Sequence, residues 1–263
     1  MRSLWQYREL TRQLLRQEIQ ELYRGTILGA FWTVLAPFLD LLVYSYVFSV
    51  LFHARVSPPV DVETQMPFGL ILLAGLLPYD ILSRVISVAP VEVLQKPNYV
   101  KKVRFPLEVL PVVRLGVAFF QGSVALGVLL VGAVYFTHRL WWTVILLPLM
   151  LLPLTLLALG LGWLLAALGV YFRDLQSMMG ILLRIWFFAT PIVYPLSSVP
   201  RWALPIVQAN PLTFVVQAVR DVLLWGRVPS IIVWLLWSGL TAGIAFLGYW
   251  WFEHTKQGFA DVM

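Results

Sequence analysis

Long apolar stretches separated by short polar ones make up most of the chain from residue 30 onward. A helix needs about 20 largely apolar residues to cross a bilayer. Six stretches approach or exceed that length: residues 30–52, 68–89, 107–136, 141–170, 176–194 and 231–252. The fourth contains Pro148 and Pro153 and is longer than a crossing requires, so we expect it to be tilted or kinked. The pattern predicts an all-α integral membrane protein with six transmembrane helices.

Before residue 30 the pattern changes to a helical periodicity that is too polar to cross a bilayer. In residues 2–24, charged and amide side chains recur every three or four positions, opposite an apolar side. Such a helix lies in the headgroup plane. We therefore divide the chain into a cytoplasmic amphipathic interfacial helix, residues 1–29, and a six-span transmembrane domain, residues 30–263. Gly25 and Gly29 would allow a sharp turn between the two, or a close approach of two helices.

A signal peptide would have the same basic start but a different continuation. Its apolar region is only about 7 to 15 residues long and precedes a small-residue cleavage site. The first span of this chain is longer and lacks an A-x-A pattern, so we expect the leader to be retained.

The segment at residues 195–230 is the longest non-spanning stretch between two spans. Six prolines between Pro191 and Pro229 exclude one continuous helix. Its apolar pieces, "RWALPIVQA" and "PLTFVVQAVRDVLLW", are each shorter than a crossing. They would fit two short re-entrant helices, which survive at membrane depth only against protein or a water-lined cavity. A pair of surface helices at the headgroups is the alternative.

The composition agrees with a membrane protein and removes several other classes. The 263-residue chain is 60% hydrophobic and 12% charged, whereas a soluble domain carries about a quarter charged residues. Cysteine is absent, which excludes disulfides, thiolate metal sites and cysteine nucleophiles. The three histidines lie far apart at predicted span ends, so we expect no metal site.

The net charge of +6 follows the predicted topology and requires no nucleic acid partner. With the N-terminus inside, eleven Lys and Arg residues lie in inner segments and five in outer segments. Positive residues in short loops favour the cytoplasmic side. Because six crossings return the chain to its starting side, we expect both termini in the cytoplasm.

Four charged residues fall inside the apolar spans at comparable depths: Asp40, Asp80, Arg114 and Arg184. Ionisable groups at such depth need a partner or an aqueous cavity. They could form interhelical ion pairs that fix the packing. Alternatively, Arg114 and Arg184 could face a conduit and bind an anionic substrate group, because the planar guanidinium matches phosphate oxygens.

Three aromatic residues add a second candidate lining. Trp32, Tyr44 and Trp186 lie inside spans, whereas Trp and Tyr usually concentrate at the membrane interfaces. Sugar rings stack their C–H faces on such side chains. A lipid-facing or core position is an equally good explanation of their placement.

The sequence carries no motif for nucleotide hydrolysis. It has no G-x-x-x-x-G-K-[ST], no H-E-x-x-H and no G-x-S-x-G, so another subunit must supply energy for any transport. Two cytoplasmic loops could bind that subunit: the tight connection 171–178 and the proline-bounded loop 94–111, which carries Lys96, Lys101, Lys102 and Arg104. The orientation rule alone also explains these basic residues.

Five stretches resemble one known family and occur in that family's order. They are "YRGTILGAFWTVLAPFLDLLVYSYVFSVLF", "KKVRFPLEVLP", "YFRDL", "FFATPIVYPLSSVP" and "NPLTFVVQAVRD". Each is weak alone, but together they cover nearly the whole chain. The sequence resembles the membrane subunit of ABC-2 type exporters of cell-surface polysaccharides, which include O-antigen permeases and teichoic acid permeases.

The resemblance implies a homodimer of six-span subunits working with two copies of a separate ABC ATPase subunit. ATP and Mg would bind to that partner, and this chain would be a transport subunit without a cofactor or an ATPase site. The implied function is export of a lipid-linked polysaccharide across the bacterial cytoplasmic membrane. The pyrophosphate end of the substrate would enter from the inner leaflet.

The resemblance also implies a coupling helix between spans two and three. By position, ATPase coupling falls on Asn98, Lys101, Lys102, Arg104 and Phe105, with a further inner contact at Arg173 and Asp174. For the substrate channel we select residues of the apolar spans that suit a sugar chain or a phosphate: Trp32, Tyr44, Arg114, Arg184 and Trp186.

Two other functions compete with polysaccharide export. An ABC-2 exporter of a drug or lipid would also lack a nucleotide motif in its permease. A membrane enzyme acting on lipid phosphates would need an acid, base or metal cluster near one interface. Asp80 with Glu92 is too sparse to form one.

Overall fold

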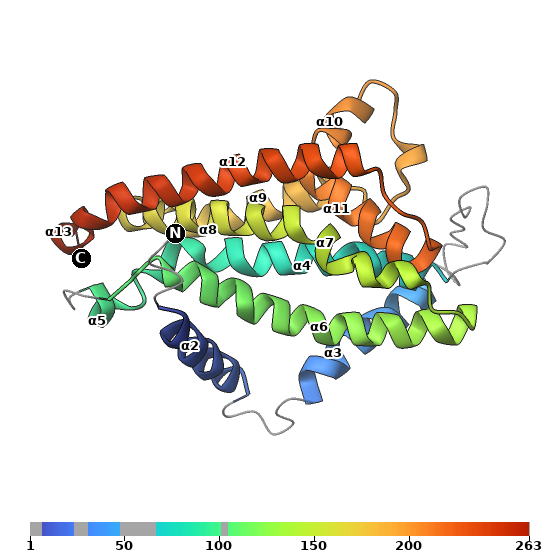
Figure 1. Cartoon of the computed structure of the whole chain (residues 1–263), viewed down its shortest axis with the longest axis horizontal. Coiled ribbons are helices and arrows are strands. Elements are labelled where there is room, and N and C mark those ends of the chain that lie inside the picture. The colour runs from blue at the N-terminus through green and yellow to red at the C-terminus, as the bar shows by residue number, and fades with distance from the viewer. Residues whose placement is uncertain (1–6, 24–30, 48–66, 101–104, 263) are drawn as a thin grey trace.

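The computed structural model describes residues 7–23, 31–47, 67–100 and 105–262, and within these ranges every regular element is a helix (Figure 1). Four helical stretches are long and apolar enough to cross a membrane: α4 (Phe68–Glu92), α6 (Val109–Thr137), the composite stretch Trp142–Tyr171, and Ile231–Gly258, which contains α12 (Ile231–Thr255) and η5 (Lys256–Gly258). The structure therefore confirms the all-α class for the described residues and contains four candidate spans where the sequence predicted six.

Two further apolar helices are described over fewer residues than a crossing needs. The first span, predicted at residues 30–52, contains α3 (Phe31–Tyr44) and a π-helical turn to Val47, and the rest of it lies outside the described residues. The fifth, predicted at 176–194, is α9 (Leu175–Ala189). It ends early because Pro191 disfavours helical backbone in the residue before it, and Thr190 is extended, with φ −105° and ψ 136°.

The fourth predicted span, which we expected to be tilted or kinked, is divided into three helical pieces at its two prolines. A 3₁₀ helix, η2 (Trp142–Leu146), leads into the single turn α7 (Leu147–Met150), and α8 (Leu152–Tyr171) follows. Pro148 and Pro153 both lie in the first turn of their helices, where a missing N–H leaves no hydrogen bond unmade. The prolines thus restart the helix without removing bonds from its interior.

Helix α4 is the centre of the bundle, in contact with α3, α6, α8, α9 and α11 (Figure 1). Residues 68–78 are all buried, and they are apolar around the whole helix, which is typical of a helix enclosed by others.

On one side of α4, α8 packs against α12 at glycines. A Cβ on Gly160 would lie 2.7 Å from the backbone nitrogen of Ala245, and a Cβ on Gly248 would lie 2.1 Å from the Gly160 carbonyl oxygen. The two backbones therefore touch.

The predicted amphipathic helix is α2 (Arg8–Glu21). Its buried Leu14 packs on Val109 and Val113 of α6, so its apolar side contacts the bundle. Gly25 and Gly29 lie outside the described residues. One end of the molecule contains the last residues of α4 and the first residues of α6. It also carries α5 (Pro97–Val100) and α13 (Phe259–Val262) (Figure 1). We call it the α5 end.

The segment 195–230 contains short helices at the opposite end. They are η3 (Leu196–Ser198), α10 (Leu204–Gln208), α11 (Pro211–Arg220) and the π-helical turn η4 (Asp221–Trp225). The Asn210 side chain caps α11 by accepting a hydrogen bond from the backbone nitrogen of Leu212. Helix α10 projects beyond the bundle, whereas α11 packs against α4 and α8 (Figure 1). We call this the α10 end.

Candidate transport and coupling site

A chain of ion pairs connects α2 to the α5 end of the bundle. Glu18 of α2 contacts Lys96 Nζ at 2.5 Å with one carboxylate oxygen and Arg114 Nη2 at 3.5 Å with the other. Arg114 Nε also lies 3.5 Å from Glu92 Oε1, and the Glu92 side chain is 3% exposed. Opposite charges at these distances hold α2, the end of α4 and the start of α6 together.

These contacts correct the expected pairing of Arg114. The sequence placed it at one depth with Asp40, Asp80 and Arg184, but its carboxylate partners are Glu18 and Glu92. Arg114 lies only five residues from the first residue of α6, close to the α5 end. Counting residues along separate spans could not show this, because it assumes that all helices start at the same height.

A second ion-pair group anchors the C-terminal end of α12. Lys256 Nζ lies 3.3 Å from Glu108 Oε2 and 2.8 Å from Glu253 Oε1. Glu108 is buried, and its backbone carbonyl accepts a hydrogen bond from Trp163 Nε1 at 3.0 Å. The start of α6 is therefore tied to α8 and α12 as well as to α2.

The two predicted ATPase-contact segments come together at the α5 end. Tyr99 and Phe105, which flank residues 101–104, stack with ring centroids 4.2 Å apart. The tight turn after α8 lies at the same end, where Val170 packs in one cluster with Val93. Phe172 is 64% exposed and its neighbours Arg173 and Asp174 are also exposed. Lys101, Lys102 and Arg104 lie outside the described residues, as does the side chain of Asn98.

A polar cavity of about 310 Å³ lies between α3, α4 and α6. Trp32, Asp40 and Asp80 line it together with Arg84 and Gln121. Arg84 Nη1 donates a hydrogen bond to Gln121 Oε1 at 3.1 Å. Asp40 and Asp80 do lie at a comparable depth, but neither forms a salt bridge in the part of the chain that the structure describes.

Arg184 lies on the other side of α4, in a groove between α4 and α9. The groove has a volume of about 410 Å³ and is also lined by Arg84. Tyr79 closes part of it by donating a hydrogen bond to the Leu183 carbonyl at 3.0 Å. Sequence reasoning passed over Arg84, although its position four residues after Asp80 places both side chains on one face of α4.

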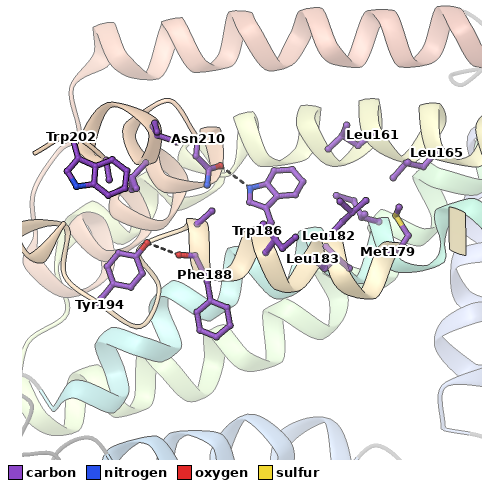
Figure 2. A pocket seen from close by; sticks show the side chains of 16 residues that line it. Leu161, Leu165, Met179, Leu182, Leu183, Trp186, Phe188, Tyr194, Trp202 and Asn210 are labelled. Atoms are coloured by element: carbon purple, nitrogen blue, oxygen red, sulfur yellow. Dashed lines mark hydrogen bonds between the residues drawn. The ribbon is translucent and has the colours of Figure 1, made fainter. Parts of the chain in front are cut away.

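Trp186 lines a third cavity, of about 680 Å³, between α8, α9 and α10 (Figure 2). Most of its lining is apolar, and the polar atoms at its edge are satisfied within the protein. Trp186 Nε1 donates to Asn210 Oδ1 at 3.0 Å, and Asn210 Nδ2 donates to Thr190 Oγ1 at 2.8 Å. Tyr194 donates to the Phe188 carbonyl (Figure 2). This cavity can accept a hydrocarbon chain more readily than a sugar.

Tyr44 is half-buried and packs against the main apolar core around α4. The five predicted channel residues therefore lie in five settings: the polar cavity, the core, the ion-pair chain, the α4–α9 groove and the apolar cavity. Among these settings, the polar cavity that contains Trp32 and the groove that contains Arg184 are neighbours, because Arg84 lines both of them.

Arg220, one of the five positive residues expected in outer segments, is buried. Its side chain donates to three backbone carbonyls, those of Ile71 at 3.1 Å, Pro191 at 2.8 Å and Ile192 at 2.6 Å. Burial lowers the pKa of Arg220 to about 10, so it stays charged at neutral pH. Gly75 makes room for it, because a Cβ there would lie 2.6 Å from Arg220 Nη2. The available signal was one arginine next to an aspartate at the end of the otherwise uncharged stretch "PLTFVVQAVRD".

The arrangement described so far, a helical membrane bundle with basic and stacked aromatic residues at one end and short helices at the other, fits a transporter subunit. A family model described as "ABC-2 type transporter" matches residues 9–224. This chain belongs to the ABC-2 type transporter family. The family comprises membrane components of ABC transporters, which agrees with the absence of a nucleotide motif in this ABC-2 chain.

Named relatives of this ABC-2 protein are polysaccharide transport proteins. It is 29% identical over 263 residues to an O-antigen export system permease protein of Myxococcus xanthus, covering 99% of this chain and 98% of that protein. It is 21% identical over 253 residues to one of Klebsiella pneumoniae, covering 95% and 93%. It is 27% identical over 219 residues to a polysialic acid transport protein of Escherichia coli, covering 82% and 81%.

Proposed function

We propose that this chain is the transmembrane permease subunit of an ABC transporter that exports a lipid-linked cell-surface polysaccharide, of the O-antigen or teichoic acid type, across the cytoplasmic membrane. The proposal is carried by the similarity to an O-antigen export permease along nearly the full length of both chains. Energy comes from a separate ATPase that binds ATP and Mg. The alternative remains an ABC-2 exporter of a drug or lipid.

The working assembly is a homodimer with two ATPase subunits. Six crossings per subunit arise from the four long helices together with α3 and α9, and α10 and α11 form the re-entrant pair. Both termini are cytoplasmic, which makes the α5 end the inner end. The basic residues near this end support that orientation.

ATPase docking takes place on Asn98 to Phe105 and on the turn with Arg173 and Asp174. The position of the two segments at one end of the bundle supports this assignment. The ion pairs of Glu18 and Arg114 lie directly beside the docking loop, because Lys96 precedes α5. A movement of the docking loop would therefore be transmitted to α2 through the ion pair between Lys96 and Glu18.

The translocation path runs along α3 and α9. Trp32 at the polar cavity and Arg184 at the groove are the lining residues that the geometry supports best. Trp186 and Tyr44 lie farther toward the α10 end. They support the residues around the path and do not line it directly. Arg114 acts at the entrance, where it holds α2 in place.

Substrate-stimulated ATP hydrolysis by the purified permease and ATPase in nanodiscs tests this function. Lipid-linked glycan should raise the hydrolysis rate above the basal rate of the complex, and small hydrophobic drugs should not. The ATPase alone, with the same glycan, is the control. Stimulation by drugs and not by glycan would replace polysaccharide export with the drug-exporter alternative.

A further inference from the structure

Two arginines face the α4–α9 groove from opposite helices, inside the apolar part of the bundle. Arg84 lies about 12 Å from the α5 end of α4 and Arg184 about 13 Å from that of α9, at a rise of about 1.5 Å per residue. Both side chains are exposed. Both arginines line the same groove, which is therefore positive within the span region, and Arg184 lies five residues from the last residue of α9.

Arg184 has no hydrogen bond or ion pair within the residues that the structure describes. Arg84 uses one nitrogen, Nη1, on Gln121, which leaves further N–H donors of its guanidinium. The neighbouring Ser83 and Ser87 hydroxyls donate to the carbonyls of Asp80 and Arg84. The serine hydroxyls are thus used within α4, and the charged donors that line the groove are the two guanidinium groups.

Arg184 has no partner among the described residues, and Arg84 is bonded to the neutral Gln121 amide with the Asp80 carboxylate one turn away. Guanidinium groups placed in this way cannot lie in hydrocarbon without large cost, so the groove must hold water or an anion. Ordinary phospholipid headgroups lie at the membrane surfaces, because the hydrocarbon core is about 30 Å thick. An anion that reaches this depth must travel through the protein. The planar guanidinium fork matches phosphate oxygens in bidentate geometry, and two forks can share one diphosphate.

We propose that Arg84 and Arg184 form a binding site for the diphosphate group of a lipid-linked substrate, in the groove between α4 and α9. The inference rests on the proposed function, because it takes its substrate from there. It replaces the expected partnership of Arg184 with Arg114 by one with Arg84. Gly180, also at the groove, leaves it open, because a Cβ at that position meets nothing within 4 Å.

Single cysteines test the site cleanly, because the chain has none of its own. In the complex with its ATPase in nanodiscs, Gly180→Cys should react faster with a sulfonate-bearing methanethiosulfonate than with a trimethylammonium-bearing one. Adding Arg84→Gln and Arg184→Gln should lower the rate of the anionic reagent about tenfold, as expected for lost charged hydrogen bonds. Gly239→Cys on α12 is the matched control, because a Cβ there also meets nothing within 4 Å.

Gly239 lies among exposed leucines on a spanning helix, so charged reagents should not label it. If Gly180→Cys were equally unreactive, the groove would face lipid and the proposal would be wrong. Equal rates with and without the arginines would also overturn it.

Protection by ligands identifies the bound group. Farnesyl diphosphate should slow labelling of Gly180→Cys by the anionic reagent, and farnesol should not. Protection by farnesol would indicate a hydrocarbon site, and protection by a higher phosphatidylglycerol fraction would indicate a phospholipid headgroup. Either result overturns the diphosphate assignment.

Glycan export measured in cells separates this inference from the function on which it rests. Arg184→Gln should assemble with the ATPase but export poorly, and Arg201→Gln, an exposed arginine at the α10 end, should export normally. Normal export by Arg84→Gln/Arg184→Gln would refute the site and leave the proposed function intact. Absence of glycan export by the unmodified chain would refute the proposed function itself.

Discussion

Individual charged residues decide how the helices of this protein are fixed to one another. Arg220 is the clearest example, because its three donors join α11 to α4 and to the turn after α9. The carbonyls of Pro191 and Ile192 lie just beyond the end of α9, where no helix continues that could supply N–H donors to them. A guanidinium supplies several donors at once, which one neutral side chain could not.

Arg220→Gln should reduce the stability of the permease strongly. The shorter amide cannot reach all three carbonyls, and buried acceptors left without donors should lower the free energy of unfolding by about 3 kcal/mol. Thermal unfolding of purified protein, followed by fluorescence-detected gel filtration, measures the change. Gly75→Ala should act in the same direction because it crowds Arg220 Nη2, whereas exposed Arg201→Gln should leave the melting temperature unchanged. Similar melting curves for Arg220→Gln and Arg201→Gln would contradict this role.

The partners of such residues could not be predicted from the sequence. The charge of Arg220 was visible, but its environment depends on how a non-spanning helix folds back on α4. The same is true of Arg114, whose glutamates come from α2 and the last residue of α4. Periodicity shows which residues share a face of one helix, and it carries no information on the rotation or height of another helix.

At the scale of the elements, the sequence predicted the long helices well and their ends less well. The four long candidate spans follow from apolar length alone, and Pro148 and Pro153, from which we expected a tilt or kink, mark the starts of α7 and α8. The fifth span was predicted to end at residue 194, but α9 ends at Ala189. The prediction followed the apolar residues beyond Pro191 and gave too little weight to the effect of this proline on the residue before it. Apolar content therefore predicted burial in this region better than it predicted helix.

Helix α2 is the element whose attachment depends most on charge. Its Glu18 contacts both Lys96 and Arg114, and only Leu14 of its residues is buried. If these pairs attach α2, Glu18→Lys should loosen it, and Glu18→Lys with Lys96→Glu should restore part of the loss. The expected coupling energy is roughly 0.5–1 kcal/mol for partly exposed pairs.

A double-mutant cycle on thermal stability measures that coupling, and it should weaken in high salt. Glu9→Lys with Arg12→Glu serves as the control, because that pair lies within α2 and is about two-thirds exposed. Equal coupling in the two cycles would show that Glu18 does not attach α2 to the bundle.

At the scale of the whole molecule, the two ends differ in chemistry. The α5 end gathers both ion-pair groups and the segments predicted to bind the ATPase, whereas the α10 end carries short helices around an apolar cavity. The sequence predicted this division through its basic loops. It could not predict that the selected channel residues would separate into different cavities.

Replacement of Lys101, Lys102 and Arg104 by alanine should weaken binding of the ATPase about tenfold while leaving membrane insertion intact, because lost interfacial charges reduce affinity. Co-purification of a tagged ATPase with the permease, titrated over ATPase concentration, measures this. Arg139→Ala with Arg201→Ala removes positive charge from the opposite end and should have no effect. Unchanged co-purification of the triple variant would exclude the loop as a docking site.

The glycine contact between α8 and α12 also restricts how the protein can move. Where Gly160 meets Gly248, backbone lies on backbone, and no side chain is present that could change rotamer to absorb a displacement. Sliding α8 by one turn, about 5.4 Å, would bring Leu156 or Leu164 into a space that already excludes a single methyl group. Helices α8 and α12 must therefore move as one rigid body during a transport cycle, and the relative motion that opens a path falls to helices other than these two.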